Sequence, residues 1–186
     1  MDWKVKFEAA LPYHEFLHRY GTEVHRERWH RVYEAVRLTA QQRALLAGFQ
    51  RQVNLLVLAG AWCGDCARQC PILQRFAEAT PRIQLRFLDR EEHPDLRELL
   101  AFNRGYRIPV VVFLSEDFAE VARYGERTLS LYRQMAAEGL GPACPVGVQP
   151  PGEDLLHRVT EEWLCEVERV QLLLRLSPRL RQLHGD

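Results

Sequence analysis

The sequence has no excess of charge of either sign. Its 186 residues include 25 Lys and Arg against 25 Asp and Glu. A nucleic acid or an anionic membrane is attracted by a basic surface field, and a chain with balanced charge does not generate one. We therefore predict neither a nucleic-acid partner nor a membrane partner, and any binding has to be local.

Long apolar runs are also missing. No stretch approaches the ~20 consecutive apolar residues of a transmembrane helix. The N-terminus, Met-Asp-Trp-Lys-Val-Lys, lacks the apolar core of a signal peptide. These two absences predict a cytoplasmic protein. The length suits one domain with a full core and some additional chain, rather than two independent domains.

Cysteine is scarce and unevenly placed. The chain has five cysteines, an odd number, and Cys63, Cys66 and Cys70 lie within eight residues of one another. A secreted disulfide framework usually has an even number of cysteines. The pattern instead indicates one reactive site, with Cys144 and Cys165 as additions that have no partner in the sequence.

The reactive site is predicted where an apolar strand runs into a helix. Residues 53–59 form a short Val- and Leu-rich run, as expected of a central strand buried on both faces. Apolar residues then recur at helical intervals over residues 66–79. Cys63 would lie at the helix N-terminus, where unpaired N–H groups and the helix dipole stabilise a thiolate. That thiolate can attack a disulfide, and Cys66 can close onto Cys63 to release the product.

Three segments resemble the thioredoxin family. Residues 62–66, Trp-Cys-Gly-Asp-Cys, are similar to the Trp-Cys-Gly-Pro-Cys site of that family. Pro71 follows at the position of the proline that kinks the active-site helix, and residues 107–113, Arg-Ile-Pro-Val-Val-Val-Phe, resemble the segment that contains the family's cis-proline. The resemblance covers roughly residues 50–137. It implies an α/β thioredoxin fold, a central mixed sheet flanked by helices, with helical extensions at both termini.

The resemblance also implies roles for the cysteines and their neighbours. Cys63 is expected to be the attacking thiol and Cys66 the resolving thiol of a redox-active disulfide, with no other cofactor. Trp62, Gly64 and Asp65 are expected to tune the site. The predicted activity is that of a thiol–disulfide oxidoreductase acting on protein or small-molecule disulfides.

Substrate binding is expected at Trp62, Ile108 and Pro109. By resemblance to the family, Trp62 offers an apolar docking face, and the backbone at Ile108 and Pro109 pairs with an extended substrate chain. A cis bond before Pro109 would leave that backbone open rather than bury it in a regular strand. The expected partners are protein thiols and disulfides, together with an unidentified reductase or electron donor.

Asp65 is where the site departs from thioredoxin, which has proline at this position. Its charge should raise the pKa of Cys63 by repulsion, although a carboxylate there is favoured by the helix dipole and could cap the first turn. The family also carries a buried aspartate six residues before its first cysteine, and that position is Val57 here. Asp65 is therefore either a helix-capping residue or a partial replacement for that aspartate.

Cys70 leaves two interpretations open. It shares a helical face with Cys66 one turn away, so it is either a small apolar core residue or an auxiliary thiol. Cys63, Cys66 and Cys70 are also similar to the end of a ferredoxin cysteine run, but that run needs one more cysteine. A zinc site would need a second pair of ligands. We predict no metal.

A second motif competes with the dithiol. Residues 14–18, His-Glu-Phe-Leu-His, match the H-E-x-x-H pattern of zinc proteases. The extended pattern requires a third histidine at a position that is Val24, and His25 is one residue late. We therefore expect a surface helix with His14 and His18 facing solvent.

Turn and capping signals divide the chain into four parts. We predict an N-terminal helical extension (1–49), a thioredoxin-like domain with the order βαβαββα (50–137), a Gly- and Pro-rich connector (138–152) and a C-terminal helical extension (153–186). The predicted helices cover about 12–20, 22–38, 39–48, 63–79, 94–103, 128–137 and 153–176, and the strands 53–59, 83–88, 109–114 and 118–124.

Two details of the extensions can be predicted as well. Val24, Trp29, Val32, Tyr33 and Val36 form a candidate inward stripe of the second helix. The helix over 153–176 should end before a proline and pack on the core or on the N-terminal helices. Such added helices also suit an alternative function, a thioredoxin-like binding module that docks one dedicated partner with little turnover.

Overall fold

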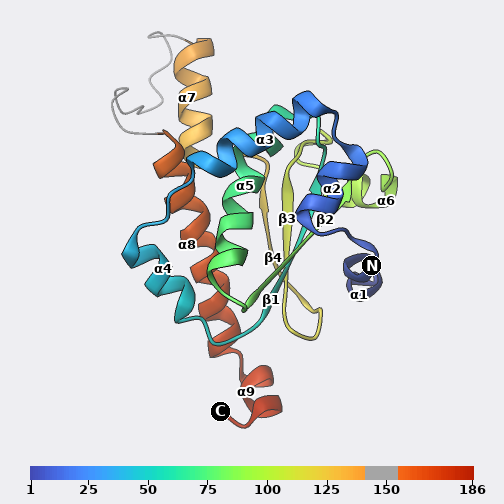
Figure 1. Cartoon of the computed structure of the whole chain (residues 1–186). Coiled ribbons are helices and arrows are strands. Elements are labelled where there is room, and N and C mark those ends of the chain that lie inside the picture. Colours follow the sequence, from blue (N-terminus) through green and yellow to red (C-terminus); the bar gives the residue numbers. More distant parts are fainter. Residues whose placement is uncertain (141–154) are drawn as a thin grey trace.

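The computed structural model of the protein describes residues 1–140 and 155–186, and its centre is a four-stranded sheet in the order β2-β1-β3-β4 (Figure 1). Strand β1 (Val53–Ala59) pairs in parallel with β2 (Ile83–Asp89) and antiparallel with β3 (Val110–Leu114). Strand β3 also pairs antiparallel with β4 (Glu120–Gly125). The sheet is therefore mixed, as the resemblance implies.

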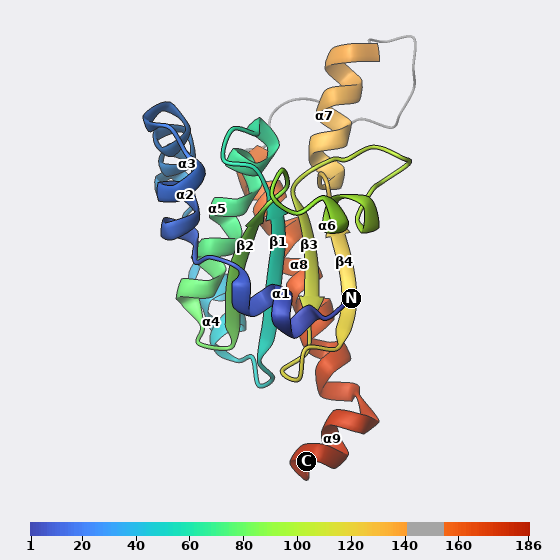
Figure 2. The same cartoon turned by 90° about the vertical axis from the view of Figure 1, so that its right-hand side faces the viewer.

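Helices cover both faces of this sheet. Figures 1 and 2 show α5 and α8 on one face, α1 and α6 over the other, and α2 and α3 beyond the β2 edge. Because both faces are covered, all seven residues of β1 are buried, without polar alternation. The helices in the described ranges are α1 (Trp3–Ala9), α2 (Tyr13–Tyr20), α3 (Glu23–Ala35), α4 (Ala40–Ala47), α5 (Gly64–Ala79), α6 (Pro94–Leu99), α7 (Leu129–Leu140), α8 (Leu155–Leu176) and α9 (Pro178–His184).

Both α3 and α4 begin with a capping box. Thr39 and Gln42 form a reciprocal capping box at α4, and Thr22 forms one at α3. Helix α3 nevertheless ends earlier than predicted, because Val36 takes an extended conformation that leads to the cap of the next helix. The inward stripe is also partly wrong: Trp29 is buried, whereas Val24 is 62% exposed.

Two helices at the ends of the described chain were not predicted. In α1, Asp2 caps the first turn, and Trp3 and Phe7 lie one turn apart on the buried face. In α9, Pro178 occupies the first turn after the cap Ser177, a position where its missing N–H costs nothing. Pro178 therefore starts a new helix as well as following the end of α8.

Helix α6 is shorter than the predicted helix over 94–103. It ends at Leu99, and Asn103 and Arg104 have φ angles of 47° and 61°. That left-handed region is incompatible with continuing a right-handed helix. The residues that follow α6 instead form an isolated bridge between Phe102 and Gly105.

The C-terminal helix α8 packs on the core, as predicted. The Trp163 ring meets Tyr124 of β4 edge to face at 5.0 Å. Further along, the Gln171 side chain accepts a hydrogen bond from the Arg51 N–H at 2.7 Å and donates to the Arg51 carbonyl at 2.8 Å, just before β1. Helix α7 packs against α8 through Ser130, whose hydroxyl donates to Glu162 at 2.7 Å.

Two sequence predictions extend beyond the described ranges. Residues 141–152 of the predicted connector, including Cys144, and residues 153–154 of the predicted helix over 153–176 lie outside them. No helix within residues 1–140 and 155–186 has the length and apolar character needed to cross a membrane.

Candidate active site around Cys63 and Cys66

Cys63 lies at the predicted junction between a strand and a helix. It is the N-cap residue of α5, and its N–H closes the turn after β1 by donating to the Gly60 carbonyl at 3.0 Å. The Cys63 thiol is half-buried, while Cys66, one turn into the helix, is fully buried. One thiol of the pair is therefore accessible and the other is protected, the division of labour that dithiol exchange needs.

The turn that carries Cys63 is held from two sides. Gly60 lets the Trp62 ring approach the backbone, since a Cβ at this position would lie 2.9 Å from the ring. The Trp62 ring is 45% exposed, with the Arg90 guanidinium 4.8 Å from its centroid. From the other side, the Trp29 indole N–H donates to the Ala61 carbonyl at 2.9 Å. At Gly64, by contrast, a Cβ would meet no neighbouring atom within 4 Å.

The segment with the predicted cis-proline faces the dithiol. The Ile108–Pro109 bond is cis, as predicted, and the Cys63 thiol donates to the Ile108 carbonyl with an S···O distance of 3.7 Å. Both Ile108 and Pro109 are buried, so less of this backbone is open than the sequence analysis expects. The Ile108 carbonyl is therefore the hydrogen-bond acceptor of the Cys63 thiol.

The two thiols influence each other's protonation. Burial raises the pKa of Cys66. Contact with the Cys66 thiol, followed by burial, raises the pKa of Cys63, whereas the backbone N–H groups of Cys66 and Asp65 at the helix start lower it. The N–H groups at the helix start therefore stabilise the Cys63 thiolate, as expected. The contact with Cys66 and the burial have a larger effect, so the net result is a raised pKa.

Asp65 is paired rather than free beside the thiols. Its carboxylate accepts a hydrogen bond from the Arg127 guanidinium, which also donates to the Glu126 carboxylate at 2.9 Å. The Asp65 side chain is only 17% exposed. The main partner of Asp65 is therefore Arg127, whose positive charge compensates the carboxylate. Neither a helix cap nor a replacement for the buried aspartate of the family includes this partner.

Glu126 is the centre of the network behind this pair. Its buried carboxylate accepts hydrogen bonds from the Tyr132 hydroxyl at 2.8 Å and from Arg127, and it forms an ion pair with Arg107 at 3.2 Å. The Glu126 backbone carbonyl accepts from Gln69 of α5 at 2.8 Å. The network therefore ties α5 to the loop between β4 and α7.

Glu126 and Arg127 were not predicted from the sequence. The pairing of β3 with β4 nevertheless indicates that they lie near the dithiol. In the antiparallel β3–β4 pair, Val110 lies opposite Gly125. Because β3 starts beside the dithiol, the end of β4 and the residues that follow must return to the same place.

A family model described as thioredoxin matches residues 10–138, more than half of the chain. The protein belongs to the thioredoxin family. The matched range begins within the N-terminal helices, so it includes α2, α3 and α4, which the sequence analysis assigns to an extension. A comparison with curated proteins finds no match.

Solved structures show the same fold. A protein of unknown function from Pseudomonas aeruginosa is 22% identical, with a TM-score of 0.68 over 91% of this chain and 96% of its own. An HIV epitope scaffold is also 22% identical, with a TM-score of 0.70 over 91% of this chain and 97% of its own. At this level of identity the likeness establishes the fold of this thioredoxin-family protein and no more.

The remaining candidate residues lie apart from the exposed thiol. Cys70 is fully buried and its thiol contacts Cys66, which agrees with a core residue and leaves the auxiliary-thiol hypothesis as a prediction. His14 and His18 are exposed on α2, as expected. Within the described part of this thioredoxin-family protein, no group of three or more His, Cys, Asp or Glu side chains is placed to hold a metal ion.

Proposed function

We propose that this protein is a cytoplasmic thiol–disulfide oxidoreductase in which Cys63 attacks and Cys66 resolves. The observation that carries the proposal is the pairing of a half-exposed Cys63 at the start of α5 with a buried Cys66 in contact with it. The membership in the thioredoxin family supports it.

The exchange proceeds in two balanced steps. The Cys63 thiol loses its proton and the thiolate attacks one sulfur of a substrate disulfide, so a mixed disulfide forms and the other substrate sulfur leaves as a thiolate, which takes up a proton. The Cys66 thiolate then attacks Cys63, forms the Cys63–Cys66 disulfide and releases the second substrate thiol. The substrate gains two electrons and the dithiol loses two. A dithiol reductase or a small thiol restores the reduced pair.

The structure supports a role for each neighbour of the thiols. The exposed Trp62 ring offers an apolar contact for a substrate protein. The Ile108 carbonyl accepts a hydrogen bond from the Cys63 thiol, and Pro109 is the next residue along that segment. No cofactor besides the cysteine pair is required for this chemistry. The partners in this proposal are protein disulfides and a thiol-based electron donor.

Trapping of the mixed disulfide tests the proposal. Reduced Cys66→Ser protein should form a covalent adduct with oxidised insulin that persists until a reductant is added, because the resolving thiol is missing. Cys63→Ser protein should form none. Cys165→Ser is the matched control, since Cys165 is an exposed thiol on α8 away from the site, and it should behave as wild type. Faster alkylation of Cys66 than of Cys63 in the reduced protein would contradict the assignment.

A dedicated binding module is the second candidate function. It is favoured by three exposed apolar side chains at intervals of three residues on α7, Leu129, Tyr132 and Met135, which are 54%, 45% and 43% exposed. Tyr132 also joins the network behind the dithiol through Glu126. A turnover assay separates the candidates: an oxidoreductase reduces insulin repeatedly when a thiol donor is supplied, whereas a binding module stops after about one equivalent.

A further inference from the structure

Arg90 lies beside the turn that carries the dithiol. Strand β2 ends at Asp89, and the N–H of the next residue, Arg90, donates to the Ala59 carbonyl at 2.9 Å. Ala59 is the last residue of β1, so the parallel pairing of the two strands continues up to the turn before Cys63. The backbone of Arg90 is therefore fixed by the sheet at the edge where Cys63 lies.

The Arg90 guanidinium connects two segments of the site. Its Nη1 donates to the Tyr106 carbonyl at 2.8 Å, and its central carbon lies 4.8 Å from the centroid of the Trp62 ring. Trp62 belongs to the turn that carries Cys63. Tyr106 lies two residues before Ile108, the acceptor of the Cys63 thiol. One side chain thus spans the dithiol turn and the segment with the cis-proline.

The other nitrogens of this guanidinium fix its plane. Nε donates to the Glu91 carboxylate at 2.9 Å, and Nη2 donates to the same carboxylate. All three nitrogens of Arg90 therefore have a partner, and because a guanidinium is rigid and planar, its orientation over the Trp62 ring is determined. A lysine carries its donors on one atom at the end of a flexible chain, so it cannot span the same partners.

The Trp62 ring is also restricted from the side of the backbone. A Cβ on Gly60 would lie 2.9 Å from this ring and 3.1 Å from the Ile108 side chain, so glycine is needed to leave room for both. The ring nevertheless remains 45% exposed. Its exposed part is thus held in one place beside Cys63 and stays open to a partner.

A second contact between an arginine and an aromatic ring adjoins the first. The Arg97 guanidinium lies 4.8 Å from the centroid of the Tyr106 ring, and Arg97 pairs with the Glu91 carboxylate at 3.6 Å. Glu91 is therefore shared by two arginines, of which Arg90 stacks on the dithiol turn and Arg97 on Tyr106. Arg97 offers a matched comparison, because it has the same charge, the same carboxylate partner and an aromatic ring that is not on the turn.

We propose that Arg90 is a positioning residue, which holds the Trp62 ring in the orientation against which a substrate protein docks. The fixed ring is a preformed contact surface, so less side-chain entropy is lost when a protein disulfide binds. A small disulfide reaches Cys63 without covering that ring. Arg90 therefore makes the site selective for protein disulfides over small ones, a role that rests on the proposed oxidoreductase function.

Two rate constants measured on the same full-length variants test this role. The reduced protein reacts with oxidised insulin, a protein disulfide, and with bis(hydroxyethyl) disulfide, a small uncharged one. In Arg90→Met the ratio of the first rate constant to the second should fall at least about threefold, because the ring loses the contact that fixes it. An unchanged ratio would overturn the role. Equal losses with both disulfides leave the ratio unchanged and would mean an effect on the thiol itself.

Arg90→Lys separates the position of the guanidinium from its charge. This variant keeps the positive charge but not the planar fork, so the ratio should stay at least about twofold below that of the wild type. Full restoration by lysine would mean that charge alone is responsible, and it would refute the role.

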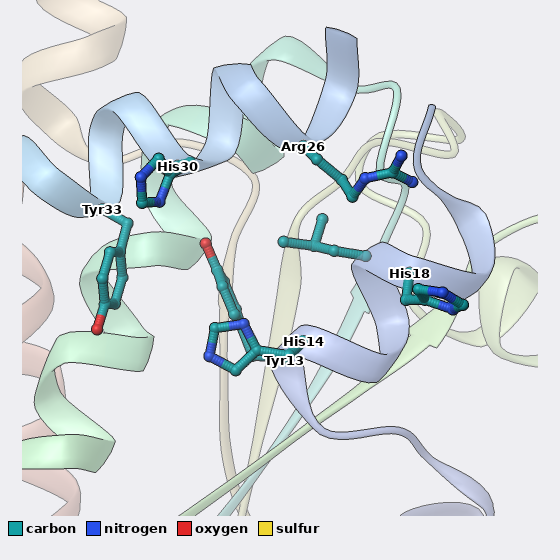
Figure 3. Close-up of a pocket in the computed structure, with 7 residues that line it drawn as sticks. Tyr13, His14, His18, Arg26, His30 and Tyr33 are labelled. Carbon is teal, nitrogen blue, oxygen red and sulfur yellow. The ribbon is translucent and has the colours of Figure 1, made fainter. Parts of the chain in front are cut away.

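Two control variants remove the same charge elsewhere. Arg97→Met breaks an ion pair of the same cluster but leaves the contact with Trp62 in place. Arg26→Met removes an arginine that donates to the Gly21 carbonyl in the cleft between α2 and α3 (Figure 3), whose described lining includes no residue of the candidate active site. Both should change the ratio by less than about 1.5-fold. A loss in either control equal to that of Arg90→Met would mean general charge attraction and would contradict the role.

Coupling between Arg90 and Trp62 is the direct test. In a Trp62→Ala background, Arg90→Met should lower the ratio by less than about 1.5-fold, because the ring through which it acts is already missing. The indole N–H NMR signal of Trp62 should also shift in Arg90→Met, whereas that of the buried Trp163 should not. Additive losses in the double variant, or an unmoved Trp62 signal, would refute the role.

The behaviour of the wild type separates this role from the proposed function. If the wild type reduces neither disulfide, the oxidoreductase function fails and the role of Arg90 fails with it. If the wild type reduces both and the ratio does not respond to Arg90→Met, only the role of Arg90 is refuted.

Discussion

The indole N–H of Trp29 donates a hydrogen bond of 2.9 Å to the carbonyl oxygen of Ala61, the residue before Trp62. Trp29 belongs to α3 and is fully buried. A helix that the sequence places in an N-terminal extension therefore holds the turn that carries Cys63. The family match from residue 10 agrees with this role, because it includes the same helix.

The first prediction concerns this hydrogen bond. Trp29→Phe keeps an aromatic ring but leaves the Ala61 carbonyl unpaired, which should lower the free energy of unfolding by about 1–3 kcal/mol. Alkylation of Cys63 should also become faster, because the turn is held less firmly. Urea denaturation and iodoacetamide kinetics measure the two effects. Tyr33→Phe, which removes a solvent-exposed hydrogen bond from the same helix, is the control and should cost less than about 1 kcal/mol.

The strand-to-helix junction could be predicted because its signals are local. The apolar run of β1 and the cysteine spacing lie within a few residues of this junction. The start of α4 could be predicted for the same reason, because Thr39 and Gln42 cap the helix that follows them directly. The opposite holds for the pair of Asp65 and Arg127, whose members are 62 positions apart. That contact depends on the register of β3 with β4, which the sequence pattern does not specify.

Ambiguous local signals account for the other differences. Pro178 can equally follow one helix or begin the next, and only the Ser177 cap distinguishes the two. The inward face of α3 was assigned from apolar spacing, which included Val24 although the helix is anchored by Trp29.

The second prediction concerns the pH dependence of the reduced dithiol. Contact with Cys66 and burial raise the pKa of Cys63, so its thiol is neutral at pH 7 and loses its proton only at higher pH. The rate of alkylation by iodoacetamide should therefore rise with pH and reach no plateau at or below about 8.5, the ordinary value for cysteine. Free glutathione is the reference thiol. A plateau between pH 5 and 7 would mean that the helix start dominates after all.

The third prediction separates the two interpretations of Cys70. As a fully buried core residue, it should cost about 1 kcal/mol of stability when replaced by Ala, because a small cavity is left. Insulin reduction should remain within twofold of wild type. Chemical denaturation and a turnover assay check the two parts, with Cys165→Ala as the exposed control. A loss of turnover beyond tenfold, with normal stability, would support the auxiliary-thiol hypothesis instead.

The last prediction concerns Asp65 and Arg127, which compensate each other beside the thiols. Asp65→Asn removes a negative charge and leaves the guanidinium, which favours the Cys63 thiolate. The pKa of Cys63 should therefore fall, and the reduction potential should rise at alkaline pH, where the thiolate forms and stabilises the reduced protein. Arg127→Gln leaves the carboxylate uncompensated and should do the reverse. Since ~30 mV corresponds to about 1.4 kcal/mol and the pair is partly screened, each shift should be a few tens of millivolts at most.

The double variant decides whether charge is the mechanism. If both residues act through their charges, the opposing shifts should largely cancel when Asp65→Asn and Arg127→Gln are combined. Arg107→Gln is the control, because Arg107 is half-exposed and pairs with Glu126 rather than with Asp65. Equilibration against a glutathione series at alkaline pH gives the potential, and pH-dependent alkylation gives the pKa of Cys63. An unchanged or lowered potential in Asp65→Asn would show that the carboxylate acts as a hydrogen-bond acceptor or proton carrier, since its charge would then be dispensable.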